Sequence, residues 1–303
     1  MPGEASGPVA VQQVWDRQNV WSRAADRLKR RIARTRLASL LLGACAAVMG
    51  AAAAQTMDLG MAGETLAFGA AVAAALVPLT VRSAGPAATH DWTRLRSVAE
   101  ALKSEVYVSL AGAGRYRGAT GPGPLLETSE RIEADGADLL HHLTGIRADA
   151  RSLPAVSGID SYARERVRRQ LDGYYRPKAR LMGGRVRVVR RIEMALGAAG
   201  AVCGAAAGAF QVGEIAAWVA VATTLAAAVS THAAASKYEY QELEYARTAG
   251  QLARLLARHE RDAAHTGSAE GGDAFAAECE LVISAQNEAW MARLPGDDAP
   301  ALP

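Results

Sequence analysis

Two glutamates, Glu64 and Glu214, occupy equivalent positions 150 residues apart, each at the start of a long apolar run. In an assembly of several copies, these side chains would form rings of carboxylates, as at the mouths of cation-conducting pores. The alternative is that each carboxylate caps a helix N-terminus and favours its dipole. The sequence leaves both interpretations open.

Hydroxyl groups and glycines inside the apolar runs are further candidates. The hydroxyls that could face water along a pore are Thr223, Thr224, Ser230 and Thr231. Such groups also often bond to carbonyls of their own helix. The glycines that recur every four or seven positions are Gly43, Gly50, Gly200, Gly204 and Gly208. Small residues at this spacing let another helix approach closely, so we predict helix packing there.

Four apolar runs must position these residues, at 37–54, 65–81, 194–210 and 215–235. At ~1.5 Å per residue, a helix over the first run is about 27 Å long, close to a hydrocarbon core of about 30 Å. The runs are apolar on every side, whereas a surface helix of a soluble protein carries a polar stripe. An alanine-rich bundle buried in a soluble protein is the competing interpretation, because alanine gains little from membrane insertion.

Basic residues flank the start of each pair of runs. Residues 23–36 contain seven Lys or Arg and residues 176–191 contain seven more, whereas the connections 55–64 and 211–214 contain none. By the positive-inside rule, the N-terminus, middle segment and C-terminus are cytoplasmic. The clusters can also attract anionic lipid head groups. We therefore predict a multi-pass protein of the inner membrane, with the lipid bilayer as a partner.

The sequence also contains an internal repeat. A shift of 150 residues aligns the two pairs of runs and the amphipathic helices predicted after them, at 92–110 and 238–259. The predicted fold class is all-α, an integral membrane protein with two tandem two-span helical hairpins and long cytosolic amphipathic helices. The predicted domains are a first two-span unit at 11–118, a linker at 119–158 with one helix at 125–150, a second two-span unit at 159–262, and a flexible break with a short amphipathic helix at 263–303.

Patterns for catalysis are lacking. Cys45, Cys203 and Cys279 have no neighbours at metal-ligand spacing, and adjacent His141 and His142 point to different sides of any helix. We predict that the protein is not an enzyme and has no cofactor and no metal. The basic clusters come without a recognition module, so no nucleic-acid partner is expected.

Three polar segments carry a resemblance to a known family. They are YARERVRRQLDGYYRPKA at 162–179, RSVAEALKSEVY at 96–107 and ECELVISAQNEAWMARL at 278–294. With the apolar hairpins, they resemble the SLATT domains, two-transmembrane effector modules of bacterial conflict systems, here in two tandem copies. The resemblance implies an anti-phage membrane effector. Such an effector would assemble as a homo-oligomer, permeabilise the inner membrane on a cytosolic signal and work with a nucleotide-signalling protein.

Two other functions fit the same elements. A non-permeabilising scaffold would recruit cytosolic partners through the amphipathic helices. A small-molecule transporter fits less well, because four short spans lack the broken helices and buried polar site typical of transporters. Growth arrest on expression would distinguish a pore from a scaffold.

Overall fold

The computed structural model describes residues 7–263 and 269–292, apart from the side chains of 81–83, 214, 263, 269–270 and 286–292. These described ranges are all-α and contain no β-strand, which confirms the predicted fold class. The chain forms two compact units. We call them the core unit, built from the described parts of 1–29, 86–179 and 243–303, and the hairpin unit, residues 30–85 and 180–242.

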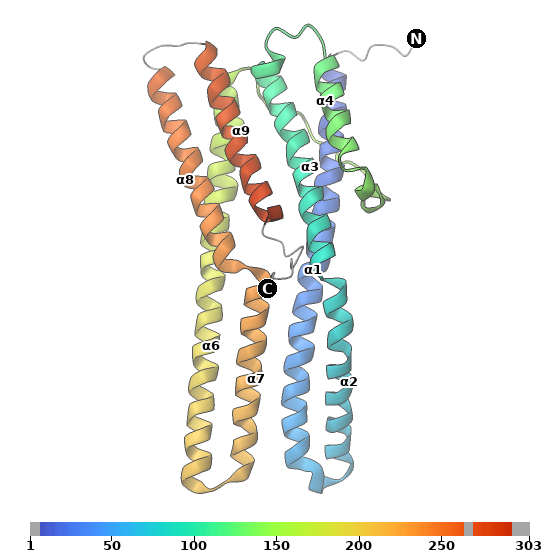
Figure 1. Cartoon of the computed structure of the whole chain (residues 1–303), viewed down its shortest axis with the longest axis vertical. Helices are drawn as coiled ribbons and strands as arrows, with labels where there is room; N and C mark the ends of the chain where they lie inside the picture. Colours follow the sequence, from blue (N-terminus) through green and yellow to red (C-terminus); the bar gives the residue numbers. More distant parts are fainter. Residues whose placement is uncertain (1–6, 264–268, 293–303) are drawn as a thin grey trace, which may run out of the picture. The chain divides into compact units, whose positions relative to one another are not determined.

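The hairpin unit contains two helical hairpins (Figure 1). In the first, the long helix α1 (Gly7–Thr56) leads through the 3-10 helix η1 (Met57–Leu59) into α2 (Met61–Ser83). Gly60 makes the turn with a φ of 63°, a backbone conformation that glycine adopts at no steric cost. Pro78 lies inside α2, which continues to Ser83.

The second hairpin pairs α6 (Arg176–Phe210) with α7 (Gly213–Ser236). Alanine, the strongest helix former, is the commonest residue in both helices. Lys237 ends α7 in the left-handed conformation, with φ 49° and ψ 43°, and its amide donates to the carbonyl of Ala234. The next helix, α8 (Tyr238–Ala263), begins directly after this break.

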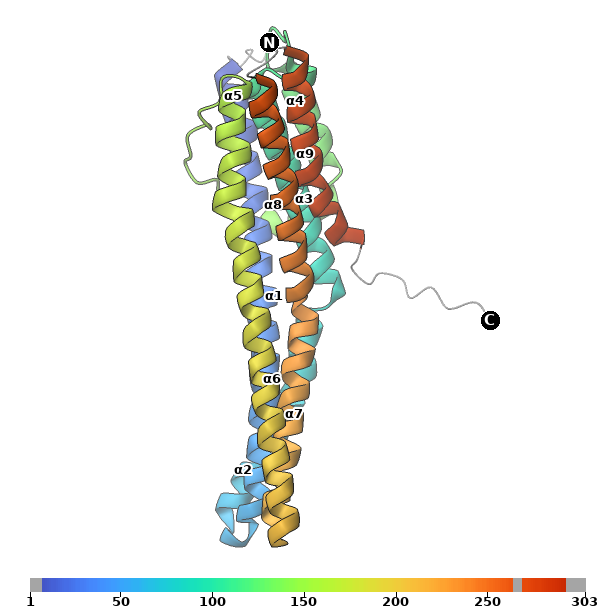
Figure 2. The same ribbon diagram turned by 90° about the vertical axis from the view of Figure 1, so that its left-hand side faces the viewer.

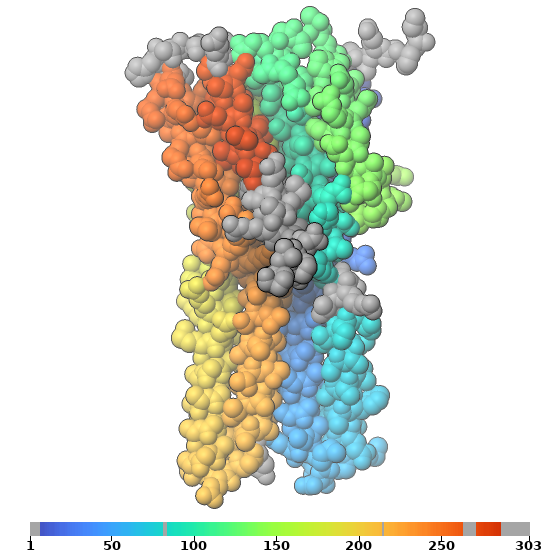
Figure 3. Space-filling view, in the orientation of Figure 1, coloured from blue at the N-terminus to red at the C-terminus, as the bar shows by residue number. Residues whose placement is uncertain are grey.

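The core unit takes its helices from distant parts of the sequence. Besides the start of α1 and most of α8, its elements are α3 (Pro86–Ala111), η2 (Gly114–Tyr116), α4 (Gly123–Ala134), η3 (Ala137–Leu143), α5 (Ile159–Tyr162), η4 (Ala163–Arg168), η5 (Leu171–Tyr175) and α9 (Ala269–Ala292). The segments η4 and η5 are π-helical and connect α5 to α6. Helix α9 packs along α3 (Figures 2 and 3).

Buried side chains from five segments fill the core unit. Trp21 of α1, Leu102 of α3, Tyr162 of α5, Leu252 of α8 and Cys279 of α9 are each at most 1 % exposed. Leu102 and Leu252, which belong to the two helices predicted to be amphipathic, therefore face this interior.

The single helix predicted over 125–150 is wrong. Helix α4 ends at Ala134, and a turn at Gly136 separates it from η3. The turn lies against α1, since a Cβ on Gly136 would be 2.8 Å from the ring of Trp21. Of the break predicted in 263–303, residues 264–268 and 293–303 lie outside the described residues, and residues 269–292 form the helix α9.

Candidate functional site: apolar hairpins and a buried charged cluster

The hairpins expose their large apolar side chains instead of burying them. Leu41, Phe68, Met194, Val202 and Phe210 are between 55 % and 75 % exposed. Apolar area on this scale requires a lipid or protein environment, and continuous helices satisfy the backbone hydrogen bonds within lipid. Among the described residues, four helical segments are long and apolar enough to cross a membrane. The chain is therefore a membrane protein.

Glycines set the close approach inside each hairpin. A Cβ built on Gly200 would lie 3.6 Å from the Cβ of Ala222, and one on Gly204 would lie 3.9 Å from Cγ2 of Val219. Gly208 has no described atom within 4 Å of its built Cβ. Two of the three predicted glycines thus face α7, where the Cβ of an alanine would make ordinary van der Waals contact; Gly200 is buried there and Gly204 is exposed.

In the first hairpin, only the later of the two predicted glycines contacts the partner helix. A Cβ on Gly50 would lie 4.0 Å from that of Ala70 on α2. The equivalent atom on Gly43 would meet no described atom within 4 Å.

The candidate pore residues whose side chains the structure describes lie on the surface of the hairpin unit. Glu64 is exposed in the first turn of α2, whereas the side chain of Glu214 lies outside the described residues. The hydroxyls of Thr223, Thr224 and Thr231 each donate to a carbonyl three or four residues earlier in α7. This local bonding is the alternative anticipated for them.

The predicted hydroxyl at Ser230 differs in its surroundings. Its exposed side chain lines a cavity between α6 and the end of α7. The four hydroxyl residues therefore share a helix, but only Ser230 lines this cavity.

A buried cluster of charged side chains, absent from the sequence-based candidates, lies inside the core unit. Arg166 on η4 is 1 % exposed, and its guanidinium makes a bidentate ion pair with Glu280 of α9. Its Nε donates to Oε1 at 2.9 Å and its terminal nitrogen donates to Oε2 at 2.8 Å. The Tyr162 hydroxyl donates to the same carboxylate at 2.8 Å. This two-pronged geometry is the strongest form of an Arg–carboxylate pair.

Helix α3 completes the cluster. The Glu100 carboxylate lies 3.7 Å from the Arg166 guanidinium and 2.8 Å from that of Arg96. The Lys103 ammonium lies 3.8 Å from the same carboxylate. We define the charged cluster as Arg96, Glu100, Lys103, Arg166 and Glu280, of which Arg96 and Lys103 are part-buried and the other three lie deeper. It ties α3, η4 and α9 together.

Electrostatics keep the cluster ionised at neutral pH. Burial by itself would raise the pKa of Glu100, but the nearby cations Lys103, Arg96 and Arg166 outweigh burial and bring its pKa to about 2. Burial lowers the pKa of Lys103 to about 8, even though Glu100 opposes the change. Burial also opposes ionisation of Glu280, yet Arg166 holds the pKa of that carboxyl below its ordinary value. Glu280 is therefore stabilised by Arg166 of another segment, whereas Glu100 is stabilised first by Lys103 and Arg96 of its own helix and then by Arg166.

Residues 162–290, which contain Arg166 and Glu280, match the model of the family described as SMODS and SLOG-associating 2TM effector domain 1. This region is a SLATT domain. Residues 19–122, which contain Glu100, match the model of a family of unknown function (DUF4231). Neither a curated protein nor a solved structure matches the chain. The SLATT prediction is confirmed for the second half, and a second SLATT copy in the first half stays a prediction.

The charged cluster crosses from the SLATT domain to the other matched region. Its two SLATT members, Arg166 and Glu280, are 114 residues apart, and its α3 members lie in the DUF4231 match. A sequence signal for it exists, because the three polar segments that resemble the SLATT family contain all five residues. Only the fold shows that those segments meet.

Arg166 lies in the first of two π-helical segments, η4 and η5. The segments η4 and η5 interrupt the regular helix at the start of the SLATT domain. Such segments are rare, and they occur often at functional sites. Tyr175 at the end of η5 is 1 % exposed and packs with Tyr174 and Tyr245. The entrance to α6 is thus fixed by both ionic and aromatic contacts.

Proposed function

We propose that this protein is a membrane effector of a bacterial conflict system, whose hairpins assemble and permeabilise the inner membrane when the core unit receives a cytosolic signal. The observation that carries the proposal is that α6 and α7, two of the four candidate spans, lie within a region matching a two-transmembrane effector domain. The effector role comes from the description of that family.

The surface of the hairpin unit supports assembly in a membrane. Its exposed apolar side chains suit lipid or another hairpin, and its glycine-rich helices allow close packing. The basic residues before each hairpin favour a topology with both termini and the core unit in the cytoplasm. A nucleotide-signalling protein is the proposed cytosolic partner, and the charged cluster is the element of the core unit suited to respond to it.

Membrane potential in bacteria expressing the chain tests the proposal. We expect the intact chain to depolarise cells and a Gly200→Leu/Gly204→Leu variant to lose this effect, because both glycines face α7. The matched control is Gly208→Leu, which should leave depolarisation intact because a Cβ at this exposed position meets no described atom within 4 Å. Membrane insertion is verified for all three.

Two outcomes would contradict permeabilisation. The first is an inserted chain that leaves the potential unchanged at every expression level, a result that favours the scaffold. The second is equal depolarisation by the intact chain and the double leucine variant, because close packing of the second hairpin would then be irrelevant to the effect.

A further inference from the structure

A cavity lies in the second hairpin where its apolar helices end. It has a volume of about 430 Å³ and is bordered by α6, the last turns of α7 and the start of α8. The break at Lys237 separates α7 from α8 beside it. The cavity belongs entirely to the hairpin unit.

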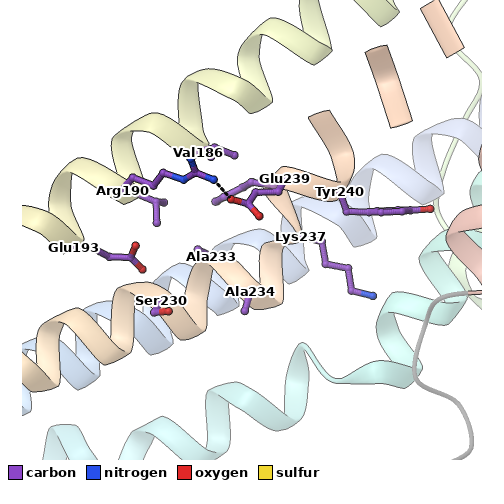
Figure 4. Close-up of a pocket in the computed structure, with 11 residues that line it drawn as sticks. Val186, Arg190, Glu193, Ser230, Ala233, Ala234, Lys237, Glu239 and Tyr240 are labelled. Atoms are coloured by element: carbon purple, nitrogen blue, oxygen red, sulfur yellow. Dashed lines mark hydrogen bonds and ion pairs between the residues drawn. The ribbon is translucent and has the colours of Figure 1, made fainter. Parts of the chain in front are cut away.

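The lining changes from apolar to charged over a short distance (Figure 4). Val186, Val189, Ala233 and Ala234 form its apolar part. Its charged part is formed on α6 and at the start of α8, just outside the apolar runs. An apolar cavity edged with charge at the end of a membrane span lies at the depth of lipid head groups.

Two carboxylates, those of Glu193 and Glu239, line this cavity. Glu239 is paired with Arg190 at 2.7 Å, and both side chains are 69 % exposed. Glu193 also lines the cavity, but among the described residues no basic side chain lies within 4 Å of its carboxylate. The ammonium of Lys237 points away from the Arg190–Glu239 pair (Figure 4). The lining therefore carries two carboxylates, of which Glu239 is paired with Arg190 and Glu193 is not, and a second cation, Lys237, on the side away from that pair.

We propose that this cavity binds the head group of an ethanolamine phospholipid. Its primary ammonium would donate hydrogen bonds to Glu193 and Glu239, and its phosphate would accept from Arg190. The apolar part would receive the first carbons of the lipid tails. A purely anionic head group suits the site less well, because the second carboxylate would repel it. The inference is independent of whether the hairpins permeabilise the membrane.

The test is lipid binding to the full chain, purified in detergent and followed by native mass spectrometry. Three lipids with identical tails are compared: phosphatidylethanolamine, phosphatidylcholine and phosphatidylglycerol. The choline head group keeps the charge of ethanolamine but cannot donate a hydrogen bond. Because hydrogen bonds between charged groups are strong, we expect the first ethanolamine lipid to bind about tenfold tighter than the choline lipid.

Glu193→Gln should bring that preference to within about twofold. The matched control is Glu64→Gln, which changes an exposed glutamate of the other hairpin and should preserve the preference. Equal binding of ethanolamine and choline lipids to the intact chain would overturn the proposal without any variant. Tightest binding of phosphatidylglycerol, or an unchanged preference in Glu193→Gln, would overturn it as well.

Discussion

Replacing Arg166 with methionine tests whether the charged cluster holds α9 in place. The change keeps an unbranched side chain but leaves the Glu280 carboxylate buried without the guanidinium that donates to both of its oxygens. Breaking a buried ion pair in this way costs about 3–5 kcal/mol. Since 1.4 kcal/mol is a factor of ten, local opening of α9 should become roughly a hundred- to several-thousand-fold more frequent.

Hydrogen exchange of the α9 amides, measured by mass spectrometry on the full chain in detergent, reports this opening directly. The matched control is Arg168→Met, two residues along η4, because the Arg168–Glu260 pair has both side chains 52 % exposed and exposed pairs contribute at most about 1 kcal/mol. An Arg166→Met/Glu280→Met variant should recover most of the protection, because an apolar pair can replace a buried ion pair. Unchanged exchange of α9 in Arg166→Met would refute the reasoning.

The remaining predictions concern acid stability and topology. The pKa of Glu100 is 4.5 in the unfolded chain and about 2 in the folded chain. The Glu100 carboxylate therefore adds about 3 kcal/mol to the free energy of unfolding above pH 4.5, and this stabilisation is lost as the pH falls toward 2. Glu100→Gln should therefore show a shallower loss of helicity by circular dichroism over this interval, and an unchanged acid profile would contradict the assignment. In a background free of native cysteines, Asp58→Cys in η1 should react with a membrane-impermeant maleimide in intact cells, whereas Glu127→Cys in α4 should react only after lysis. The reverse labelling pattern would overturn the proposed orientation.

The hairpins could be predicted from sequence because their cause is local. An uninterrupted apolar run such as 37–54 is enough to specify a membrane-length helix, and short connections force consecutive helices to pair. The glycine spacing likewise indicated which side of α6 can approach another helix. It could not show that Gly208 lacks the close contact that Gly200 makes, because that depends on how the facing side chains of α7 are placed in the folded hairpin.

The charged cluster could not be predicted because its cause is not local. Arg166, Glu100 and Glu280 look like residues of solvated helix faces in a sequence rich in Arg and Glu. Their burial follows from three segments meeting in the core unit. The helix predicted over 125–150 failed for the same reason, since the turn at Gly136 is set by its contact with Trp21.

The scarcity of large side chains in the spans has a consequence for biosynthesis. Alanine-rich helices such as α6 and α7 gain little free energy individually from entering lipid. The two-residue connection at Gln211 and Val212 brings the second helix out of the ribosome immediately after the first. We therefore expect the translocation machinery to release each pair into the bilayer as one hairpin, so that a truncation after α6 would leave that helix uninserted.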